Sequence, residues 1–101
     1  MRYLKVSEVC VDLKVDEDLL RALEDEGLIE VKRTADDEAV ISAADAERLR
    51  VSVVLLREMD VNLAGVEVVL QMRENLLAMH RQFDEILRSL VDELRKRMPP
   101  S

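Results

Sequence analysis

The stretch that decides the fold is LRALEDEGLIEVKRTADDEAVISAADAERL, residues 20–49. Gly27 follows a leucine-bearing segment, at the position where a helix commonly ends in a left-handed residue. Two short apolar segments, residues 28–31 and 39–41, flank the polar run 34–38, a pattern typical of a β-hairpin. Ser42 precedes a further helical segment, with Asp45 in its first turn, and is the expected N-cap. The stretch therefore predicts a helix, a two-stranded hairpin and a second helix.

The residues before this stretch predict an additional short helix. Residues 3–6 form an extended lead-in, and Ser7 is the expected N-cap of a helix whose apolar residues recur at i, i+3, i+4 and i+7, namely Val6, Val9, Cys10 and Leu13. A turn at residues 15–16 leads into the helix predicted over residues 17–26. With 2 Gly, 2 Pro and 2% aromatic residues, the composition favours helices over an all-β fold. We expect an all-α protein with a small two-stranded hairpin.

The residues after position 49 predict one helix to about residue 60 and a long final helix from an Asn62 cap to residue 97. At 1.5 Å per residue the final helix would be roughly 50 Å long. Its apolar residues follow the 3–4 spacing of a coiled coil, with Arg73 and His80 as polar exceptions, so a homodimer is expected. The expected division is residues 1–60 and 61–101. The predicted dimer-interface residues are Val66, Val69, Leu76, His80, Phe83, Leu87, Leu90 and Leu94.

The net charge of −7 is unevenly distributed along the chain. Residues 1–40 carry 12 acidic and 6 basic residues, whereas residues 41–101 carry 10 acidic and 9 basic residues. Nearly all the excess negative charge therefore lies on the first helices and the hairpin. Duplex DNA is bound largely through Lys and Arg that neutralise its phosphates, so an anionic segment of this kind disfavours DNA as a partner.

Residues 20–49 resemble the winged helix-turn-helix of the MerR family, in which L-R-Y-Y-E-x-x-G-L-I is followed by R-T-x-x-G-Y-R-x-Y-S. The two aromatic positions are Ala22 and Leu23 here, the Gly-Tyr-Arg of the wing is replaced by residues 37–39 (DEA), and its later Tyr by Ile41. The scaffold positions remain while the DNA-facing ones are lost. The matching residues are Leu20, Arg21, Glu24, Gly27, Leu28, Ile29, Arg33, Thr34, Ser42, Asp45 and Leu49.

Residues 62–66 (NLAGV) are similar to a run found in the heat-shock-repressor branch of MerR proteins and in their small relatives, the CbpM-type chaperone modulators. This resemblance implies a MerR-like fold that dimerises through its C-terminal helix. It also implies binding to, and inhibition of, the J-domain of a DnaJ/CbpA-like co-chaperone, whose chaperone-facing surface is basic. From charge we expect the partner-binding surface to comprise Glu17, Asp18, Arg21, Glu24, Asp25, Glu26, Asp36, Asp37 and Glu38.

Two alternatives remain open: a heat-shock-repressor-type regulator that contacts DNA phosphates through Arg21, Lys32 and Arg33, and a structural dimerisation module. The sequence offers no paired nucleophile and base, glycine-rich phosphate loop or metal-ligand cluster, so we expect neither an enzyme nor a cofactor. Cys10 is interpreted as a small buried hydrophobic residue. We expect a cytoplasmic protein without a signal peptide or membrane span, because no apolar run approaches about 18 residues.

Overall fold

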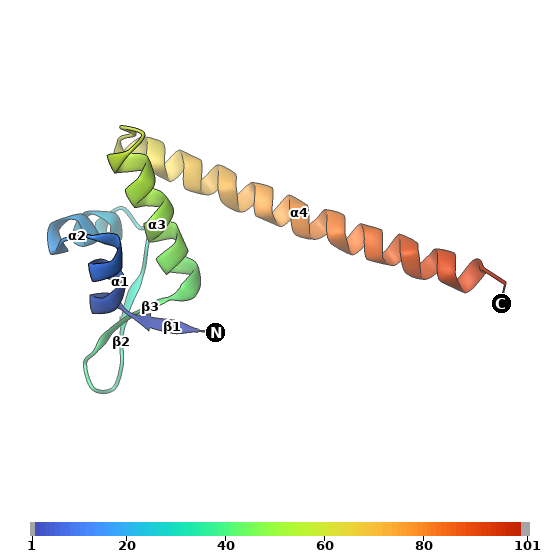
Figure 1. The fold of residues 1–101 in the computed structure, drawn as a ribbon, viewed down its shortest axis with the longest axis horizontal. Coiled ribbons are helices and arrows are strands. Elements are labelled where there is room, and N and C mark those ends of the chain that lie inside the picture. The colour runs from blue at the N-terminus through green and yellow to red at the C-terminus, as the bar shows by residue number, and fades with distance from the viewer. Residues whose placement is uncertain (1, 100–101) are drawn as a thin grey trace. The chain divides into compact units, whose positions relative to one another are not determined.

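The computed structural model describes residues 2–99, and its elements follow one another as a strand, two short helices, two strands and two longer helices (Figure 1). The residues group into two compact units, one ending at Leu70 and the other beginning at Gln71. The fold is mostly helical, as predicted. The elements are β1 (Tyr3–Lys5), α1 (Val6–Leu13), α2 (Glu17–Asp25), β2 (Val31–Arg33), β3 (Ala39–Ser42), α3 (Ala43–Arg57) and α4 (Leu63–Arg97).

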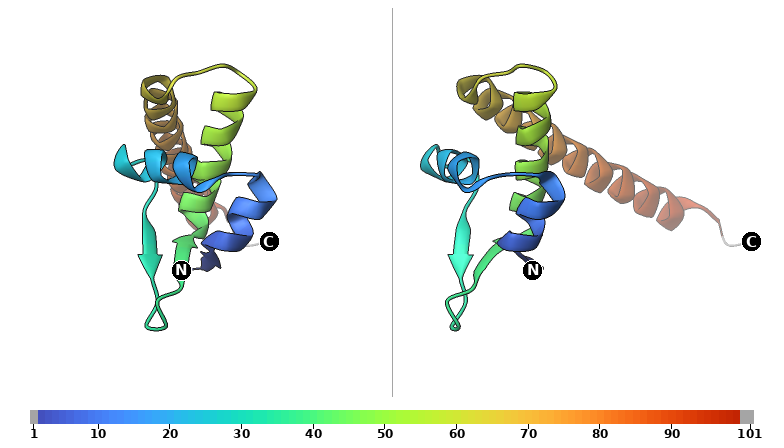
Figure 2. Two further views of the ribbon diagram at one scale, coloured as in Figure 1. Left: turned by 90° about the vertical axis from the view of Figure 1, so that its left-hand side faces the viewer. Right: turned by 60° about the vertical axis from the view of Figure 1, so that its left-hand side comes forward.

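The first unit contains a three-stranded antiparallel sheet in the order β1-β3-β2. The sequence predicted only two strands. No hairpin turn connects residues 3–5 to β3, so the local pattern does not indicate that these residues form a third strand. Its Leu4 nevertheless pairs with Ile41 of β3, and the Ala43 N–H donates to the Arg2 carbonyl at 2.9 Å. The β2–β3 hairpin reaches beyond α1 and α2, with its turn at the far end (Figures 1 and 2).

The strand β2 begins at Val31, three residues later than predicted. Leu28 and Ile29 are buried in the core instead of extending the ladder. The Glu30 N–H donates to the Asp45 carboxylate at 3.0 Å, and Arg48 Nε donates to the Leu28 carbonyl at 2.7 Å. These two side chains of α3 therefore satisfy the Leu28 carbonyl and the Glu30 N–H, which have left the strand ladder.

Side-chain caps define three of the helix starts. Asp16 accepts from the Leu19 N–H at 2.8 Å, Ser42 from the Asp45 N–H at 3.0 Å, and Asn62 from the Gly65 N–H at 2.8 Å. The prediction of Ser7 as a cap was wrong: α1 begins at Val6, directly from the end of β1, and its N-cap Lys5 makes no side-chain capping bond.

The core of the first unit includes the beginning of α4. Val66 is 0% exposed and Leu70 1% exposed, and both belong to the cluster that contains Leu23, Ile41 and Leu49. The sequence placed a boundary between residues 60 and 61, whereas the packing unit extends through two further turns of helix to Leu70. These turns lie with the first unit because their apolar side chains complete its core.

The second unit, from Gln71 onward, is the remainder of α4, and among its described residues the large apolar side chains are exposed. Their exposed fractions range from 41% at Leu77 to 67% at Leu76. A helix whose apolar stripe is left in solvent lacks the packing that normally stabilises helices in proteins.

Candidate functional site

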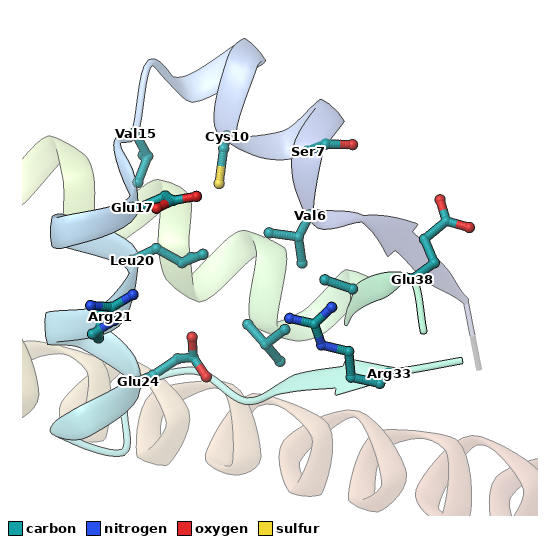
Figure 3. Close-up of a pocket in the computed structure, with 12 residues that line it drawn as sticks. Val6, Ser7, Cys10, Val15, Glu17, Leu20, Arg21, Glu24, Arg33 and Glu38 are labelled. Atoms are coloured by element: carbon teal, nitrogen blue, oxygen red, sulfur yellow. The ribbon is translucent and has the colours of Figure 1, made fainter. Parts of the chain in front are cut away.

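A groove of about 530 Å³ lies in the first unit between α1, α2 and the β2–β3 strands (Figure 3). Apolar side chains from all of these elements line it, together with charged side chains from α2, from β2 and from the residue just before β3. The groove exists because α1 and α2 both pack on the core while the hairpin diverges from them. Its lining residues are Val6, Ser7, Cys10, Val15, Glu17, Leu20, Arg21, Glu24, Val31, Arg33, Glu38 and Ala39.

Cys10 contributes the only thiol of the chain to this groove, and its sulfur points into it (Figure 3). The side chain is half-buried, and burial raises the pKa of the thiol because desolvation disfavours the thiolate. The sequence had suggested a small hydrophobic residue, and the position on the apolar stripe agrees with that interpretation. It did not indicate that the stripe of α1 is left partly uncovered.

Four of the nine residues predicted to bind a partner line this groove: Glu17, Arg21 and Glu24 from α2, and Glu38 from the hairpin. In Figure 3 the carboxylates of Glu17 and Glu24 extend from α2 toward the groove, and Arg33 extends from the opposite wall. The other five are also exposed but do not line it. They are Asp18, Asp25 and Glu26 around α2, and Asp36 and Asp37 at the hairpin turn.

The hairpin turn is built on a left-handed residue at Asp37, whose φ is 62°. The Asp37 N–H donates to the Thr34 carbonyl and the Thr34 N–H donates to the Glu38 carbonyl, both at 2.9 Å. Arg33 Nη1 donates to the Asp37 carbonyl at 3.0 Å. Position 37 is where the MerR-like wing motif has its glycine, and the positive φ gives the physical reason for a glycine there.

Two hairpin acids have basic neighbours, which reduces the charge that they present. Glu38 lies 3.4 Å from Lys5 Nζ, and the Asp37 carboxylate lies 3.9 Å from Arg33 Nη1. Within residues 2–99 no ion pair within 4.0 Å is found for Glu17 or Glu24. The open anionic groups at the groove therefore belong to α2, two turns apart on one face.

The basic residues of the hairpin are also engaged. Lys32 Nζ donates to the Tyr3 hydroxyl at 3.4 Å and lies 5.7 Å from the centre of its ring. This hydrogen bond to Tyr3, which favours the charged form, raises the pKa of Lys32. The Lys32 side chain on β2 therefore reaches over the central strand β3 and contacts Tyr3 on β1.

The predicted dimer residues fall into two groups. Val66 is buried in the core of the first unit and Val69 packs against that core, so these two positions serve the fold of a single chain. His80 Nε2 lies 3.8 Å from the Asp84 carboxylate, a neighbour on the same helix. The exposed positions on the second unit are Leu76, His80, Phe83, Leu87, Leu90 and Leu94.

Sequence reasoning missed the apolar floor of the groove. Val15 was assigned to a turn, and Val31 and Ala39 to strands, with no indication that they face the same space. The sequence offered one indication, the apolar stripes on the first two helices. These stripes are equally compatible with complete burial in the core, so they did not predict a groove. The hairpin leaves these stripes partly uncovered, and this depends on tertiary packing that the sequence pattern does not show.

Residues 4–89 match the model of the MerR HTH family regulatory proteins, so the chain belongs to this family. No curated protein matches the chain. Within the described residues there is no group of three or more His, Cys, Asp or Glu side chains placed to hold a metal ion. In the same part of the chain, none of the helices combines the length and apolarity needed to cross a membrane.

Proposed function

We propose that this protein is a chaperone modulator that binds the J-domain of a DnaJ/CbpA-like co-chaperone and inhibits it. The main supporting observation is the face formed by α2 and the hairpin, where a MerR protein would approach DNA. It carries the carboxylates of Glu17 and Glu24, for which no ion pair is found within residues 2–99. The likeness of residues 62–66 to the CbpM-type relatives supports the same proposal.

Electrostatics favour a basic protein over DNA as the partner of this face. Residues 1–40 carry an excess of six negative charges, which would repel phosphates and attract a basic helix. The wing also holds Asp37 and Glu38 in place of the family's Gly and Tyr. A bound modulator would then occlude the J-domain surface that its chaperone needs.

The proposal is tested by measuring J-domain-stimulated ATP hydrolysis by a DnaK-type chaperone while the protein is titrated in. We expect stimulation to fall toward the basal rate as the protein saturates the J-domain. Replacing Glu24, Asp25 and Glu26 by Lys should weaken this inhibition by about tenfold or more, since charged contacts at an interface set partner affinity and association rate. Unchanged stimulation at saturating protein would refute the modulator role.

The second candidate function is a DNA-binding transcriptional regulator, which the family match favours. Arg21 and Arg33 line the α2–hairpin groove, and with Lys32 they would be the phosphate contacts of such a regulator. A regulator that used them would bind duplex DNA with an affinity that falls as salt rises. Titration of a fluorescent duplex at two salt concentrations separates this candidate from the first.

We also propose that the protein is a homodimer paired through α4. The exposed apolar residues of the second unit support this, because they recur at the 3–4 spacing with which paired helices bury such a stripe. The dimer would carry two copies of the α2–hairpin face.

A further inference from the structure

We propose that the groove between α1, α2 and the β2–β3 strands is the anchor site of the partner's recognition helix. One apolar side chain of that helix enters the groove, and basic side chains beside it pair with Glu17 and Glu24. This inference rests on the proposed function for the identity of the partner. It goes further by assigning binding to the groove and its two carboxylates, and not to the other acidic residues of α2 and the hairpin.

The composition of the groove fits a protein side chain. Its apolar lining comes from Val6, Val15, Leu20, Val31 and Ala39 together with the Cys10 thiol. Its charged lining comes from Glu17, Arg21, Glu24, Arg33 and Glu38. An apolar centre within a polar rim is the usual arrangement of a protein interface, and the energetically dominant residues of interfaces fill such pockets.

The charged side chains that line the groove specify the partner further. Glu17 and Glu24 are seven residues apart on α2, a separation of about 10 Å along the helix axis. Arg21 stands between them and lines the same groove, so a cation opposite the middle of α2 would be repelled. Arg33 already forms an ion pair with Asp37, and Glu38 forms one with Lys5. The partner helix therefore places two cations about two turns apart on either side of its apolar residue.

Filling the groove tests the apolar part of the inference. Cys10→Phe places a ring in the groove, whereas Val11→Phe places the same ring on the neighbouring position, whose side chain is 75% exposed. Titrating the purified J-domain into each full-length variant, we expect Cys10→Phe to bind at least about tenfold more weakly and Val11→Phe to bind like the unmodified protein. Circular dichroism confirms that both variants retain their helices.

Charge reversal on α2 tests the electrostatic part with a matched control. Glu17→Lys with Glu24→Lys changes the two groove carboxylates, and Asp18→Lys with Asp25→Lys changes net charge equally on the same helix with the same spacing. The first pair should lower J-domain affinity by about tenfold more than the second. Equal losses would mean that a diffuse acidic surface binds the J-domain, which overturns the role of the groove.

The thiol of Cys10 reports occupancy without any substitution. Because burial raises its pKa, alkylation of the free protein is followed in mildly alkaline buffer, where a larger fraction is thiolate. Addition of the J-domain should slow alkylation at least about tenfold if its side chain covers the sulfur.

Absence of J-domain binding by the unmodified protein would overturn the proposed function. Intact binding with unprotected Cys10 and full affinity of Cys10→Phe would overturn the groove inference alone and leave the groove to a small ligand.

Discussion

Gly65 is fixed by its contact with Val61 at the start of α4. A Cβ atom at position 65 would lie 2.6 Å from Val61 Cγ1 and 3.3 Å from Asn62 Oδ1, the oxygen that caps the helix. Val61 cannot easily withdraw, because its side chain packs against the core and its N–H donates to the Leu55 carbonyl at 3.0 Å. The NLAGV run thus combines a helix cap with a position where any side chain would require Val61 to shift.

We expect Gly65→Ala to lower the free energy of unfolding by about 1 kcal/mol. Its helix propensity gain of about 1 kcal/mol is outweighed by overpacking, which costs about 1–3 kcal/mol. Urea unfolding measures the change. In a Val61→Ala background the same substitution should no longer lower the free energy of unfolding and should raise it by up to about 1 kcal/mol, because the clashing methyl groups are gone and the helix-propensity gain remains. A Gly65→Ala cost that persists in that background would contradict this explanation.

Asp37 holds a left-handed conformation that glycine adopts without steric cost. We expect Asp37→Gly to be more stable than Asp37→Ala by about 1 kcal/mol, because a Cβ atom at positive φ costs about 1–2 kcal/mol and glycine has greater freedom when unfolded. Both variants lack the carboxylate near Arg33, so the exposed ion pair cancels from the comparison. Equal stabilities in urea unfolding would indicate that the turn relaxes away from φ 62°.

At the scale of elements, α1 and α3 are joined at their C-terminal ends by Arg57. Its Nη1 donates to the Leu13 carbonyl at 2.9 Å, and its Nη2 donates to the Lys14 carbonyl. Lys14 is left-handed, with a φ of 56°, so α1 ends there and its last carbonyls need outside donors. A cation at this place also faces the negative end of the helix dipole.

Replacing Arg57 by Ala should therefore lower the free energy of unfolding by about 1–2 kcal/mol. Hydrogen bonds from a charged group contribute about 1.5–3 kcal/mol, and the exposure of Arg57 to solvent reduces that contribution. Arg50→Ala is the control, because Arg50 pairs with Glu47 on the exposed face of the same helix and such pairs contribute about 0–1 kcal/mol. Thermal or urea unfolding of both variants gives the comparison. If Arg57→Ala costs no more than Arg50→Ala, the tie between α1 and α3 contributes nothing to stability.

The sequence predicted the helices well because their signals are local. The Ser42 and Asn62 caps and the left-handed Gly27, with a φ of 73°, are formed by residues close in the chain. The strand β1 was missed because its partner β3 is more than thirty residues away. Ser7 was a wrong cap because the start of α1 is set by that same strand pairing, which competes with local capping.

The candidate site was predicted in part, for a related reason. Charge and the degenerate wing drew attention to Glu17, Glu24 and Glu38, which do line one groove. Periodicity could not show which acids would be paired, since the Lys5–Glu38 contact joins the end of β1 to the residue just before β3, which is far away in the sequence. It also assigned Val66 to a dimer interface, although the core of the first unit takes up this side chain.

At the scale of the whole molecule, the proposed dimer depends on the apolar stripe of the second unit. Replacing Leu87 and Leu90 by Lys should convert the dimer to a monomer, because each Leu buried in the pair contributes about 1.5–3 kcal/mol. Gln82→Lys with Ser89→Lys adds the same charge to exposed positions outside the stripe and should leave the dimer intact. Sedimentation velocity distinguishes the species. A Leu87 and Leu90 variant that still sediments as a dimer would contradict this interface.

The most direct test of the central claim is calorimetric titration of the protein with the J-domain of a co-chaperone from its own organism, with a DNA duplex titrated in parallel at moderate salt. The account predicts J-domain binding at about micromolar affinity or tighter, which corresponds to about −8 kcal/mol, and no heat from DNA. DNA binding without J-domain binding would contradict the account and make the protein a DNA-binding regulator of the MerR family.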